Sequence, residues 1–455
     1  MSIDVIIADD SAYLRKNIAE ILKGSELVNI LEFAKDGEEA IKFVKKYSPD
    51  VLVLDLLMPK MNGLDAFKVI MEECPTPTVI LSAISPKNLD SSIQALLMGA
   101  FDYIIKPGGI GAKDLPRFRE ELLAKVLIAS QSQIKKIFKK EDGDYGKGKS
   151  LRQEIIDQIF DFGQYINTLV PIQEAKENQE VIDIGKTKEV QKEATAKSEI
   201  KQIEKINKLS IKKSIKHKES AKLSRKNVAK PTLKTSLQKS LPSLQKRKEP
   251  VYTPNLTPIK GVSISSNIIV IGASVGGPRT ITTILKEIPR NFPAPILIVQ
   301  HLSAHFTEAF ADNLDLECKL KIKVATNGEY LKPGVVYIAP GENHMEISVD
   351  DKRPCIKIYK GTPVNFCMPS IDILFFSATR VYRDRTMGVL LTGMGSDGVE
   401  GLSSIQKVGG KTISESEETC ILFAMPKFAA EKGYADIILS SYKIPRFLID
   451  FANLK

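Results

Sequence analysis

The stretch that decides the fold of the C-terminal half is NIIVIGASVGGPRT, residues 267–280. Its apolar start predicts a buried strand, and the small residues that follow allow the backbone to turn sharply. Pro278 suits the first turn of a helix. A strand that turns directly into a helix exposes Ser274, and backbone N–H groups at a helix start can stabilise an oxyanion. The stretch therefore predicts a nucleophile elbow with Ser274 at its tip.

A dinucleotide-binding glycine turn is the main alternative for the same residues. Its spacing would be Gly-x-Gly-x-x-Gly, which residues 272–277 do not have. The next predicted strand, PILIVQ, ends at His301, where a ribose-binding carboxylate would be expected. Both observations favour the nucleophilic serine.

A nucleophilic serine needs a base and an acid that orients the base. The chain has four histidines: His217, His301, His305 and His344. His301 follows a strand as Ser274 does, so the two side chains can meet where parallel strands end. Asp397 lies in the glycine-rich turn GMGSDG after another predicted strand. We predict a Ser274, His301 and Asp397 triad, which is recognised by geometry rather than by chain order.

Metal binding is a second possible use of these histidines. His301 and His305 are four positions apart and, with His344, could hold a metal in a metal-dependent hydrolase. The chain lacks an HExxH pattern, so this hypothesis is the weaker one. We interpret His305 as a core or helix-capping residue.

Strands and amphipathic helices alternate on both sides of a long polar segment. In residues 264–455, strands are predicted at 267–271, 295–299, 335–338 and 388–392. In residues 1–137, they are predicted at 3–8, 51–54, 79–81 and 103–105, with helices around 40–44, 63–71 and 89–98. Another helix, capped by Ser11, is expected to end before Gly24. The alternation predicts two α/β domains, each with a parallel sheet covered on both faces.

Polar side chains follow four strands of the first domain where each strand ends. They are Asp9 and Asp10, Asp55, Ser82 and Lys106. Three crowded carboxylates favour a hard cation such as Mg²⁺. With Mg²⁺ and Lys106 offsetting charge, Asp55 is the candidate nucleophile toward a phosphoryl group, and the Ser82 hydroxyl stabilises the transferring oxygens.

Residues 1 to about 125 resemble a response-regulator receiver domain through IIADDS, LVLDLLMPKMNGLD, ILSA and YIIKP. The resemblance implies a flavodoxin-like (βα)5 fold with Asp55 as phosphoacceptor. It also implies that Asp10 and Asp55 bind Mg²⁺ directly, with Asp9 assisting and the Leu57 backbone carbonyl as a further ligand.

Three further roles and a partner follow from the receiver resemblance. Ser82 and Lys106 would contact the phosphoryl group, and Tyr103 matches the switch aromatic of the family. A chemotaxis histidine kinase would supply the phosphoryl group.

Residues 264 to about 450 resemble the catalytic domain of chemotaxis protein-glutamate methylesterases. The motifs are IGASVGGP, IVQHLSAHFT, VYIAPGENHM, GTPVNFCMPSIDILF and LTGMGSDGVEG. The resemblance implies a doubly wound Rossmann-like fold and the triad Ser274, His301 and Asp397. Met394 would line the site and the backbone around Val275 would stabilise the oxyanion.

The family resemblance implies an activity and its control. The substrates would be glutamate γ-methyl esters on methyl-accepting chemotaxis receptors, hydrolysed to glutamate and methanol, and receptor glutamines, which would be deamidated. Phosphorylation of the receiver would relieve inhibition, and the catalytic domain would use no cofactor. The sequence departs from the expected pattern at three places. Val275 stands where a hydroxyl residue is common, Ser303-Ala304 replace a Met-Pro pair, and Phe366-Cys367-Met368 replace a basic run.

The positive charge of the chain is confined to one segment. The 455 residues carry a net charge of +10, but residues 186–248 alone carry 20 Lys+Arg and 5 Asp+Glu. The rest of the chain is therefore negative. Residues 166–251 contain no aromatic residue, which predicts a disordered linker within 138–263, with a possible helix at 151–169.

The basic linker leaves other functional classes open. An isoleucine-rich spacing at 200–215 could contact an anionic membrane or an acidic receptor surface. Nucleic-acid binding by a response regulator is a weaker alternative, because no helix-turn-helix pattern is present and charge outside the linker is negative. A third possibility is an adaptor with little esterase activity.

Cysteine usage and hydropathy bear on the compartment. The five cysteines are scattered, with no Cys-x-x-Cys pair, and no apolar run approaches the length of a membrane-spanning helix. The first residues lack the features of a secretory signal. We therefore expect a cytoplasmic protein.

Overall fold

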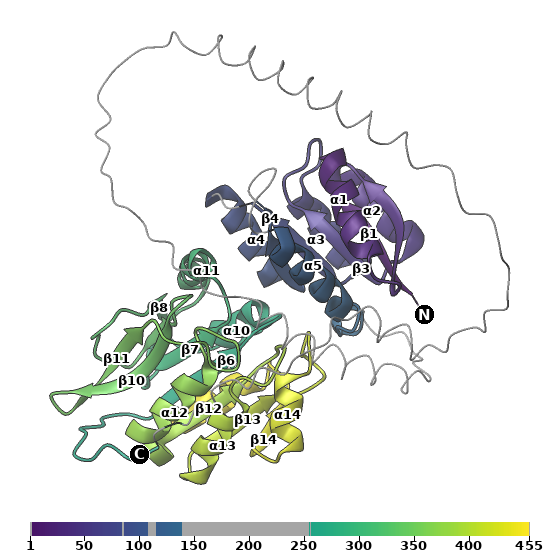
Figure 1. The fold of residues 1–455 in the computed structure, drawn as a ribbon. Coiled ribbons are helices and arrows are strands. Elements are labelled where there is room, and N and C mark those ends of the chain that lie inside the picture. The colour runs from purple at the N-terminus through teal and green to yellow at the C-terminus, as the bar shows by residue number, and fades with distance from the viewer. Residues whose placement is uncertain (1, 84–85, 108–114, 139–253, 255, 455) are drawn as a thin grey trace, which may run out of the picture. The chain divides into compact units, whose positions relative to one another are not determined.

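The computed structural model describes residues 2–83, 86–107, 115–138, 254 and 256–454 (Figure 1). All of them belong to one compact unit of the chain. The predicted linker lies almost entirely outside the described residues, as do the predicted helix at 151–169, the spacing at 200–215 and His217.

The N-terminal half alternates strands and helices from its start. Its elements are β1 (Ile3–Ala8), α1 (Ala12–Lys23), β2 (Val28–Ala34), α2 (Gly37–Tyr47), β3 (Val51–Asp55), α3 (Gly63–Glu73), β4 (Thr78–Ser82), α4 (Pro86–Met98), β5 (Asp102–Ile105), α5 (Leu115–Ala129) and α6 (Ile134–Phe138). The strands form one parallel sheet in the order β2-β1-β3-β4-β5. The predicted parallel α/β architecture is confirmed.

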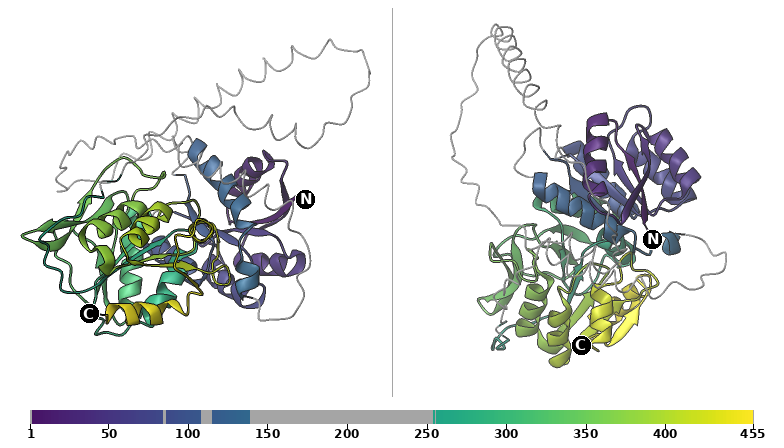
Figure 2. Two further views of the ribbon diagram at one scale, coloured as in Figure 1. Left: turned by 90° about the horizontal axis from the view of Figure 1, so that it is seen from below. Right: turned by 45° about the vertical axis from the view of Figure 1, so that its right-hand side comes forward.

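Local sequence explains the central strands and the first helix. Every residue of β3 and β4 is buried, as expected for strands with helices on both faces (Figure 2). The Ser11 hydroxyl accepts the Leu14 N–H at the start of α1, and Gly24 follows its last residue, as predicted.

Strand β2 was not predicted from the sequence. It is an edge strand with partly exposed residues, and Asn29 and Glu32 interrupt its apolar pattern. An edge strand lacks the continuous apolar run that marks a buried one, which explains why its pattern is weak.

The C-terminal half contains a larger parallel sheet. Its elements are β6 (Ile268–Ala273), α10 (Gly277–Lys286), β7 (Ile296–Gln300), α11 (Ala304–Glu317), β8 (Lys321–Val324), β9 (Val335–Ile338), β10 (His344–Asp350), β11 (Arg353–Tyr359), α12 (Ile371–Val381), β12 (Thr386–Leu390), α13 (Val399–Lys407), β13 (Lys411–Glu415), α14 (Met425–Glu431), β14 (Ile437–Leu439) and α15 (Ile444–Ala452). Seven strands pair in the order β14-β13-β12-β6-β7-β9-β8.

The order of this sheet creates a switch point beside β6. From β6 the chain builds β7, β8 and β9 on one side, then returns to build β12, β13 and β14 on the other. Loops after β6 and β12 therefore leave the sheet in opposite directions, which opens a crevice at their carboxyl ends. The predicted doubly wound fold is confirmed.

One predicted strand is shifted by two residues. The sequence indicates a strand at 388–392, whereas β12 spans Thr386–Leu390. The chain leaves the ladder at Thr392, because the Thr392 N–H is bound by the buried Glu415 side chain at 2.8 Å. This departure begins the loop that carries Asp397.

Strands β10 and β11 form an antiparallel hairpin outside the main sheet, which the sequence analysis did not foresee. Helix α12 contacts both the hairpin and β6, so almost all of its residues are buried. The Ser377 hydroxyl accepts the Ile347 N–H and fixes α12 to the hairpin. The start of α12 is thereby held rigidly beside the crevice.

Among the residues that the structure describes, no helix is long and apolar enough to span a lipid bilayer.

Candidate functional site

Ser274 lies at the tip of the turn between β6 and α10, as the sequence predicted. Gly276 takes a left-handed conformation with φ 76° as the N-cap of α10, and Pro278 occupies its first turn. The Ser274 N–H donates to the Thr392 carbonyl at 3.0 Å. The Ser274 carbonyl accepts from the Gln300 side chain at 2.8 Å. The half-buried serine is thus fixed through its backbone, with its side chain at the crevice.

His301 and Asp397 are joined by a hydrogen bond across the crevice. His301 follows β7, Asp397 lies between β12 and α13, and β12, β6 and β7 are neighbours in the sheet. The distance from His301 Nε2 to Asp397 Oδ2 is 3.0 Å. The predicted base and orienting acid are therefore together, 96 positions apart in the chain.

Ser274 and His301 share a small cavity without a direct hydrogen bond. Both line it together with Val275, Gly276 and Leu302. Among the described residues, the structure gives no hydrogen bond between the Ser274 hydroxyl and His301. Catalytic hydrogen bonds of this kind often tighten only when substrate binds. Met394 is half-buried in the loop that also carries Asp397.

The Asp397 carboxylate is buried but densely hydrogen-bonded. It accepts from the Ile371 N–H at 2.7 Å and from the Ser370 hydroxyl at 2.8 Å. These donors belong to the first turn of α12, where the helix dipole also favours negative charge. Burial opposes ionisation of Asp397, but the hydrogen bonds from His301, Ile371 and Asn365 outweigh it and lower the pKa.

A second buried carboxyl group lies beside Asp397. Asp372 accepts the Gly401 N–H at 2.6 Å, and Asn365 donates to both Asp372 and Asp397, at 2.6 and 3.0 Å. Burial and the adjacent charge of Asp397 raise the pKa of Asp372 to about 8. The pKa of Asp372 is raised and that of Asp397 is lowered, so Asp397 is the acid of this pair that loses its proton more readily beside His301.

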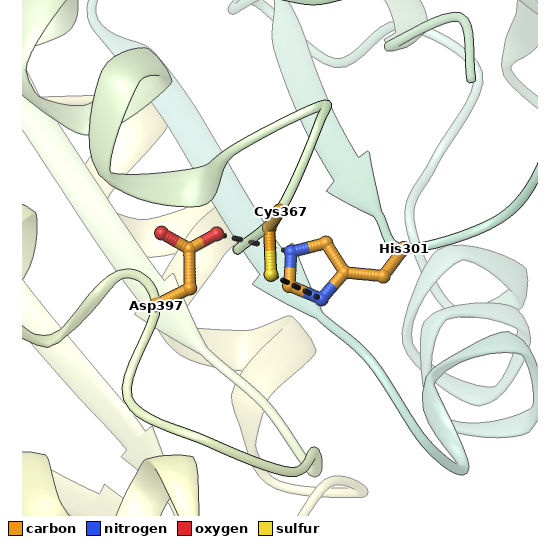
Figure 3. Close-up of side chains that lie close together, drawn as sticks. All are labelled: His301, Cys367 and Asp397. Carbon is orange, nitrogen blue, oxygen red and sulfur yellow. Dashed lines mark hydrogen bonds and ion pairs between the residues drawn. The ribbon is translucent and has the colours of Figure 1, made fainter. Parts of the chain in front are cut away.

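A thiol also lies close to the His301 ring. Cys367 Sγ is 3.8 Å from His301 Nδ1, and Figure 3 shows Cys367 beside the ring on the side of Asp397. Burial disfavours the charged ring, but the Cys367 sulfur and the Asp397 carboxylate outweigh that effect and raise the pKa of His301. The sequence analysis noted Cys367 only as a departure from a basic run.

The two other histidines that the structure describes do not join this group. His344 is buried, with Nε2 bound to the Thr362 carbonyl at 2.9 Å and Nδ1 accepting the Ser370 N–H at 3.2 Å. His305 is exposed in the first turn of α11, whose N-cap is Ser303. The interpretation of His305 as a core or capping residue is therefore wrong, and the three-histidine metal site does not form.

Three residues around Asp397 were missed by sequence reasoning. Asn365, Ser370 and Asp372 lie inside the quoted motif GTPVNFCMPSIDILF, but no spacing rule connects them with an aspartate about 30 positions later. Only the folded loop reveals their contacts.

The acidic site predicted in the N-terminal half is assembled at the carboxyl ends of β1, β3 and β5. Lys106 Nζ lies 2.8 Å from Asp9 Oδ2 and 2.7 Å from Asp55 Oδ2. Carboxylate oxygens of Asp9, Asp10 and Asp55 lie within 4.8 Å of one another. Such a set of hard oxygen donors fits Mg²⁺.

Ser82 and Leu57 also lie at this end of the sheet. Ser82 is the buried last residue of β4, and its hydroxyl accepts the Ser92 hydroxyl at 2.9 Å. The Leu57 N–H donates to Asp55 Oδ1 at 3.2 Å, so the backbone at Leu57 runs beside the acidic group.

Tyr103 of β5 contacts the segment that follows His301. Its ring stacks on Phe306 with centroids 3.7 Å apart, and its hydroxyl accepts the Ser303 N–H at 3.4 Å. Leu96, Phe101 and Asp102 of the N-terminal half line the same cavity as Ser274.

Two family models match the chain, one on each sheet. A response regulator receiver domain matches residues 5–113, and a CheB methylesterase matches residues 269–448. With the fold described above, these matches define the class: an N-terminal receiver domain joined to a C-terminal methylesterase domain.

Relatives match along almost the whole chain. The protein-glutamate methylesterase/protein-glutamine glutaminase of Methanococcus maripaludis is 31% identical over 99% of this chain and 98% of its own. The Thermotoga maritima protein of the same name is 29% identical over 98% of each chain. The chain belongs to the protein-glutamate methylesterase/protein-glutamine glutaminase family, which confirms the resemblance seen in its sequence.

A solved structure from Thermotoga maritima matches the C-terminal half. The crystal structure of the CheB methylesterase catalytic domain is 43% identical and covers 41% of this chain and 99% of that chain, with a TM-score of 0.41.

Proposed function

We propose that this chain is a phosphorylation-activated methylesterase of chemotaxis signalling. Its substrates are glutamate γ-methyl esters on methyl-accepting chemoreceptors, which it hydrolyses to glutamate and methanol. It also deamidates receptor glutamines, since the same acyl chemistry then releases ammonia. The observation that carries the proposal is the His301–Asp397 hydrogen bond beside Ser274, at the ends of three adjacent strands.

The proposed mechanism uses Ser274 as nucleophile and His301 as base. Because Asp397 binds Nε2, the free lone pair for the Ser274 proton belongs to Nδ1. Ser274 Oγ attacks the ester carbonyl, and N–H groups around Val275 stabilise the oxyanion. The ester bond breaks, and the proton held by His301 passes to the departing methoxide, which leaves as methanol. Water then attacks the acyl-enzyme by the same route, which restores Ser274 and releases the receptor with a glutamate side chain at this position.

The surroundings of Asp397 support this assignment. Its hydrogen bonds from α12 keep it ionised, so it can hold the imidazole in one orientation and stabilise the imidazolium. Met394, from the same loop, lines the substrate side of the site in this proposal.

In the receiver domain we propose Asp55 as the phosphoacceptor of a chemotaxis histidine kinase. Asp9, Asp10, Asp55 and the Leu57 carbonyl would hold Mg²⁺, and bound Mg²⁺ supplies charge neutralisation at the phosphoryl oxygens. Lys106 and Ser82 contact the phosphoryl group. Tyr103 couples this event to the esterase through Phe306, on which its ring stacks, and Ser303, which its hydroxyl contacts. Both residues belong to the segment that follows His301.

The control proposed here is relief of inhibition. Leu96, Phe101 and Asp102 line the cavity of Ser274, so contacts of the unphosphorylated receiver restrict substrate entry. Phosphorylation that moves Ser82 and Tyr103 loosens these contacts. Residues 1–137 and 264–455 are the proposed domains, joined by the linker at 138–263. The five free cysteines suit a cytoplasmic setting.

Methanol release from a methylated chemoreceptor tests the proposal. We expect Ser274→Ala to lose activity by roughly 10³-fold or more, as in serine hydrolases that lose their nucleophile. Ammonia release from a receptor with glutamine at the methylation position should fall in parallel. A Ser274→Ala protein with wild-type methanol release would refute the proposed nucleophile.

A phosphodonor such as acetyl phosphate tests the regulatory half. The ratio of methanol release with and without phosphodonor should exceed one for wild type and equal one for Asp55→Asn. Stimulation of Asp55→Asn to the wild-type ratio would contradict the role of Asp55.

A further inference from the structure

The turn that carries Ser274 is held from the strands on both sides of β6. In the sheet, β6 lies between β12 and β7. Gln300, the last residue of β7, donates its side-chain amide to the Ser274 carbonyl at 2.8 Å. Thr392, just past the end of β12, accepts the Ser274 N–H through its carbonyl at 3.0 Å. Both residues are buried, so these hydrogen bonds to the serine backbone form away from water.

The hydrogen bond from Gln300 also sets the direction of the next backbone N–H. The Ser274 carbonyl and the Val275 N–H belong to one trans peptide unit, and in a planar trans peptide these two bonds point in opposite directions. The same carbonyl accepts the Gly277 N–H at 2.9 Å, so two donors hold it in one orientation. The Val275 N–H therefore points away from both Gln300 and Gly277.

The Val275 N–H is available to a substrate. It donates to no backbone carbonyl among the residues that the structure describes. Val275 lines the same small cavity as Ser274 and His301. Its own carbonyl accepts the Thr392 hydroxyl at 3.0 Å, so the peptide units on both sides of Val275 are fixed. A donor that is fixed in advance needs no reorganisation when charge develops on a substrate oxygen.

The core does not explain why residue 300 carries a polar side chain. Gln300 is 2% exposed, and its Oε1 has no hydrogen-bond partner among the described residues. This oxygen packs against Gly277, where a Cβ would approach it within 1.9 Å. A buried acceptor without a partner costs stability, so an apolar side chain of similar length would serve folding at least as well. The donor that Gln300 supplies to Ser274 is the gain that offsets this cost.

We propose that Gln300 is a positioning residue of the esterase. By holding the Ser274 carbonyl, it directs the Val275 N–H toward the oxygen of the substrate carbonyl. Thr392 assists through its hydroxyl, which holds the following peptide unit. The proposal rests on the proposed function, because it takes Ser274 as the nucleophile and Val275 as an oxyanion donor. It adds two buried residues that take no part in proton transfer.

Gln300→Met tests the proposal, because it removes the amide donor and keeps an unbranched side chain. Methanol release from a methylated chemoreceptor is measured over a range of receptor concentrations. The kcat should fall about 10- to 100-fold, since small misplacements at a reacting centre cost up to about 10²-fold. The KM should stay within about twofold of wild type, because the lost interaction acts only in the transition state. Ammonia release from a glutamine-containing receptor should fall by the same factor.

Thr392→Val is the second variant. It keeps the shape and the backbone groups of Thr392 and removes the hydroxyl that donates to the Val275 carbonyl. Its kcat should also fall while its KM is kept. This variant decides the outcome where Gln300→Met does not fold, which thermal unfolding midpoints establish.

Matched controls remove hydrogen bonds of the same kind elsewhere in the C-terminal half. Gln406→Met removes an amide that donates to the Gly433 carbonyl at 3.1 Å. Thr282→Val removes a buried hydroxyl that donates to the Pro278 carbonyl at 2.7 Å. Both controls should keep the wild-type kcat and KM.

The possible outcomes separate this role from the proposed function. A folded Gln300→Met protein with the wild-type kcat, or with a raised KM as its only change, would overturn the positioning role. An equal fall of kcat in Gln406→Met would do the same. By contrast, a wild-type protein that releases no methanol, or a Ser274→Ala protein as active as wild type, would refute the proposed function itself.

Discussion

Two buried acids near the crevice have pKa shifts in opposite directions. Asp397 receives hydrogen bonds from His301, Ile371, Ser370 and Asn365, which stabilise its charge. Glu415, the last residue of β13, accepts the Thr392 N–H and the Thr419 hydroxyl, each at 2.8 Å. Burial raises the pKa of Glu415, because these donors, Cys420 and the charge of Arg279 do not compensate for the loss of water.

Glu415 makes stability depend on pH in a definite direction. Between the unfolded pKa and the higher folded pKa, the unfolded chain is ionised while the folded chain keeps the proton. The folded state then binds more protons, so the free energy of unfolding falls as pH rises through this window. The effect is about 1.4 kcal/mol for each pKa unit of difference.

Glu415→Gln should remove this pH dependence. The amide oxygen can still accept the Thr392 N–H, and the Thr419 hydroxyl can accept from the amide N–H. The thermal unfolding midpoint of Glu415→Gln minus that of wild type should be larger at pH 8 than at pH 5. The same difference between the two proteins at both pH values would contradict a titrating Glu415.

The turn from β6 into α10 depends on glycine for two separate reasons. Gly276 has φ 76°, a conformation that side chains rarely adopt. A Cβ there would also lie 2.6 Å from the Ile421 Cβ, so the turn leaves no room for a methyl group. This close approach holds Ser274 at the crevice.

A matched pair of variants separates backbone strain from steric clash. Gly328 has φ 79°, but a Cβ at Gly328 would meet no atom within 4 Å. Gly328→Ala should cost about 1 kcal/mol of unfolding free energy from strain alone. Gly276→Ala should cost about 1–3 kcal/mol more through overpacking. Urea unfolding at one pH measures both costs.

Methanol release should distinguish the same two variants. Gly276→Ala should lower the rate at least tenfold, because Ser274 is two residues away, whereas Gly328→Ala should retain the wild-type rate. Equal losses in the two variants would show that the close approach to Ile421 does not position Ser274.

At the scale of the whole molecule, an aromatic contact joins β5 of the N-terminal half to α11 of the C-terminal half. The Tyr103 ring of β5 stacks on Phe306 of α11, with an interplanar angle of 15°. Aromatic pairs of this kind contribute about 0.5–1.5 kcal/mol beyond burial. Loss of the contact should therefore shift the balance between restricted and open forms by up to about tenfold.

Tyr103→Ala should accordingly raise the methanol release of the unphosphorylated protein. The rate should increase by about two- to tenfold, and the stimulation by acetyl phosphate should shrink by the same factor. Tyr13→Ala is the control, because Tyr13 lies on helix α1 of the same N-terminal half and its side chain is 62% exposed. An unchanged basal rate in Tyr103→Ala would show that the contact between Tyr103 and Phe306 does not restrict the unphosphorylated enzyme.

The sequence by itself determined which residues end the central strands. Continuous apolar runs mark buried parallel strands, and Asp9, Asp55, Ser274 and His301 follow such runs directly. Because parallel strands end at one edge, their proximity follows from local pattern alone. The strands β2, β8, β13 and β14 and the hairpin of β10 and β11 escaped prediction, since their pairing and exposure depend on neighbours distant in sequence.

Only the tertiary structure decided what surrounds the catalytic candidates. The donors to Asp397 come from the loop and helix start at residues 365–372, and Cys367 meets His301 across 66 positions. Loop conformation has no periodic signal, and here it is set by packing of α12 against the main sheet and the hairpin. Side-chain contacts between such segments form only when the surrounding core fixes both backbones. Composition and spacing therefore revealed neither the donors to Asp397 nor the contact of Cys367 with His301.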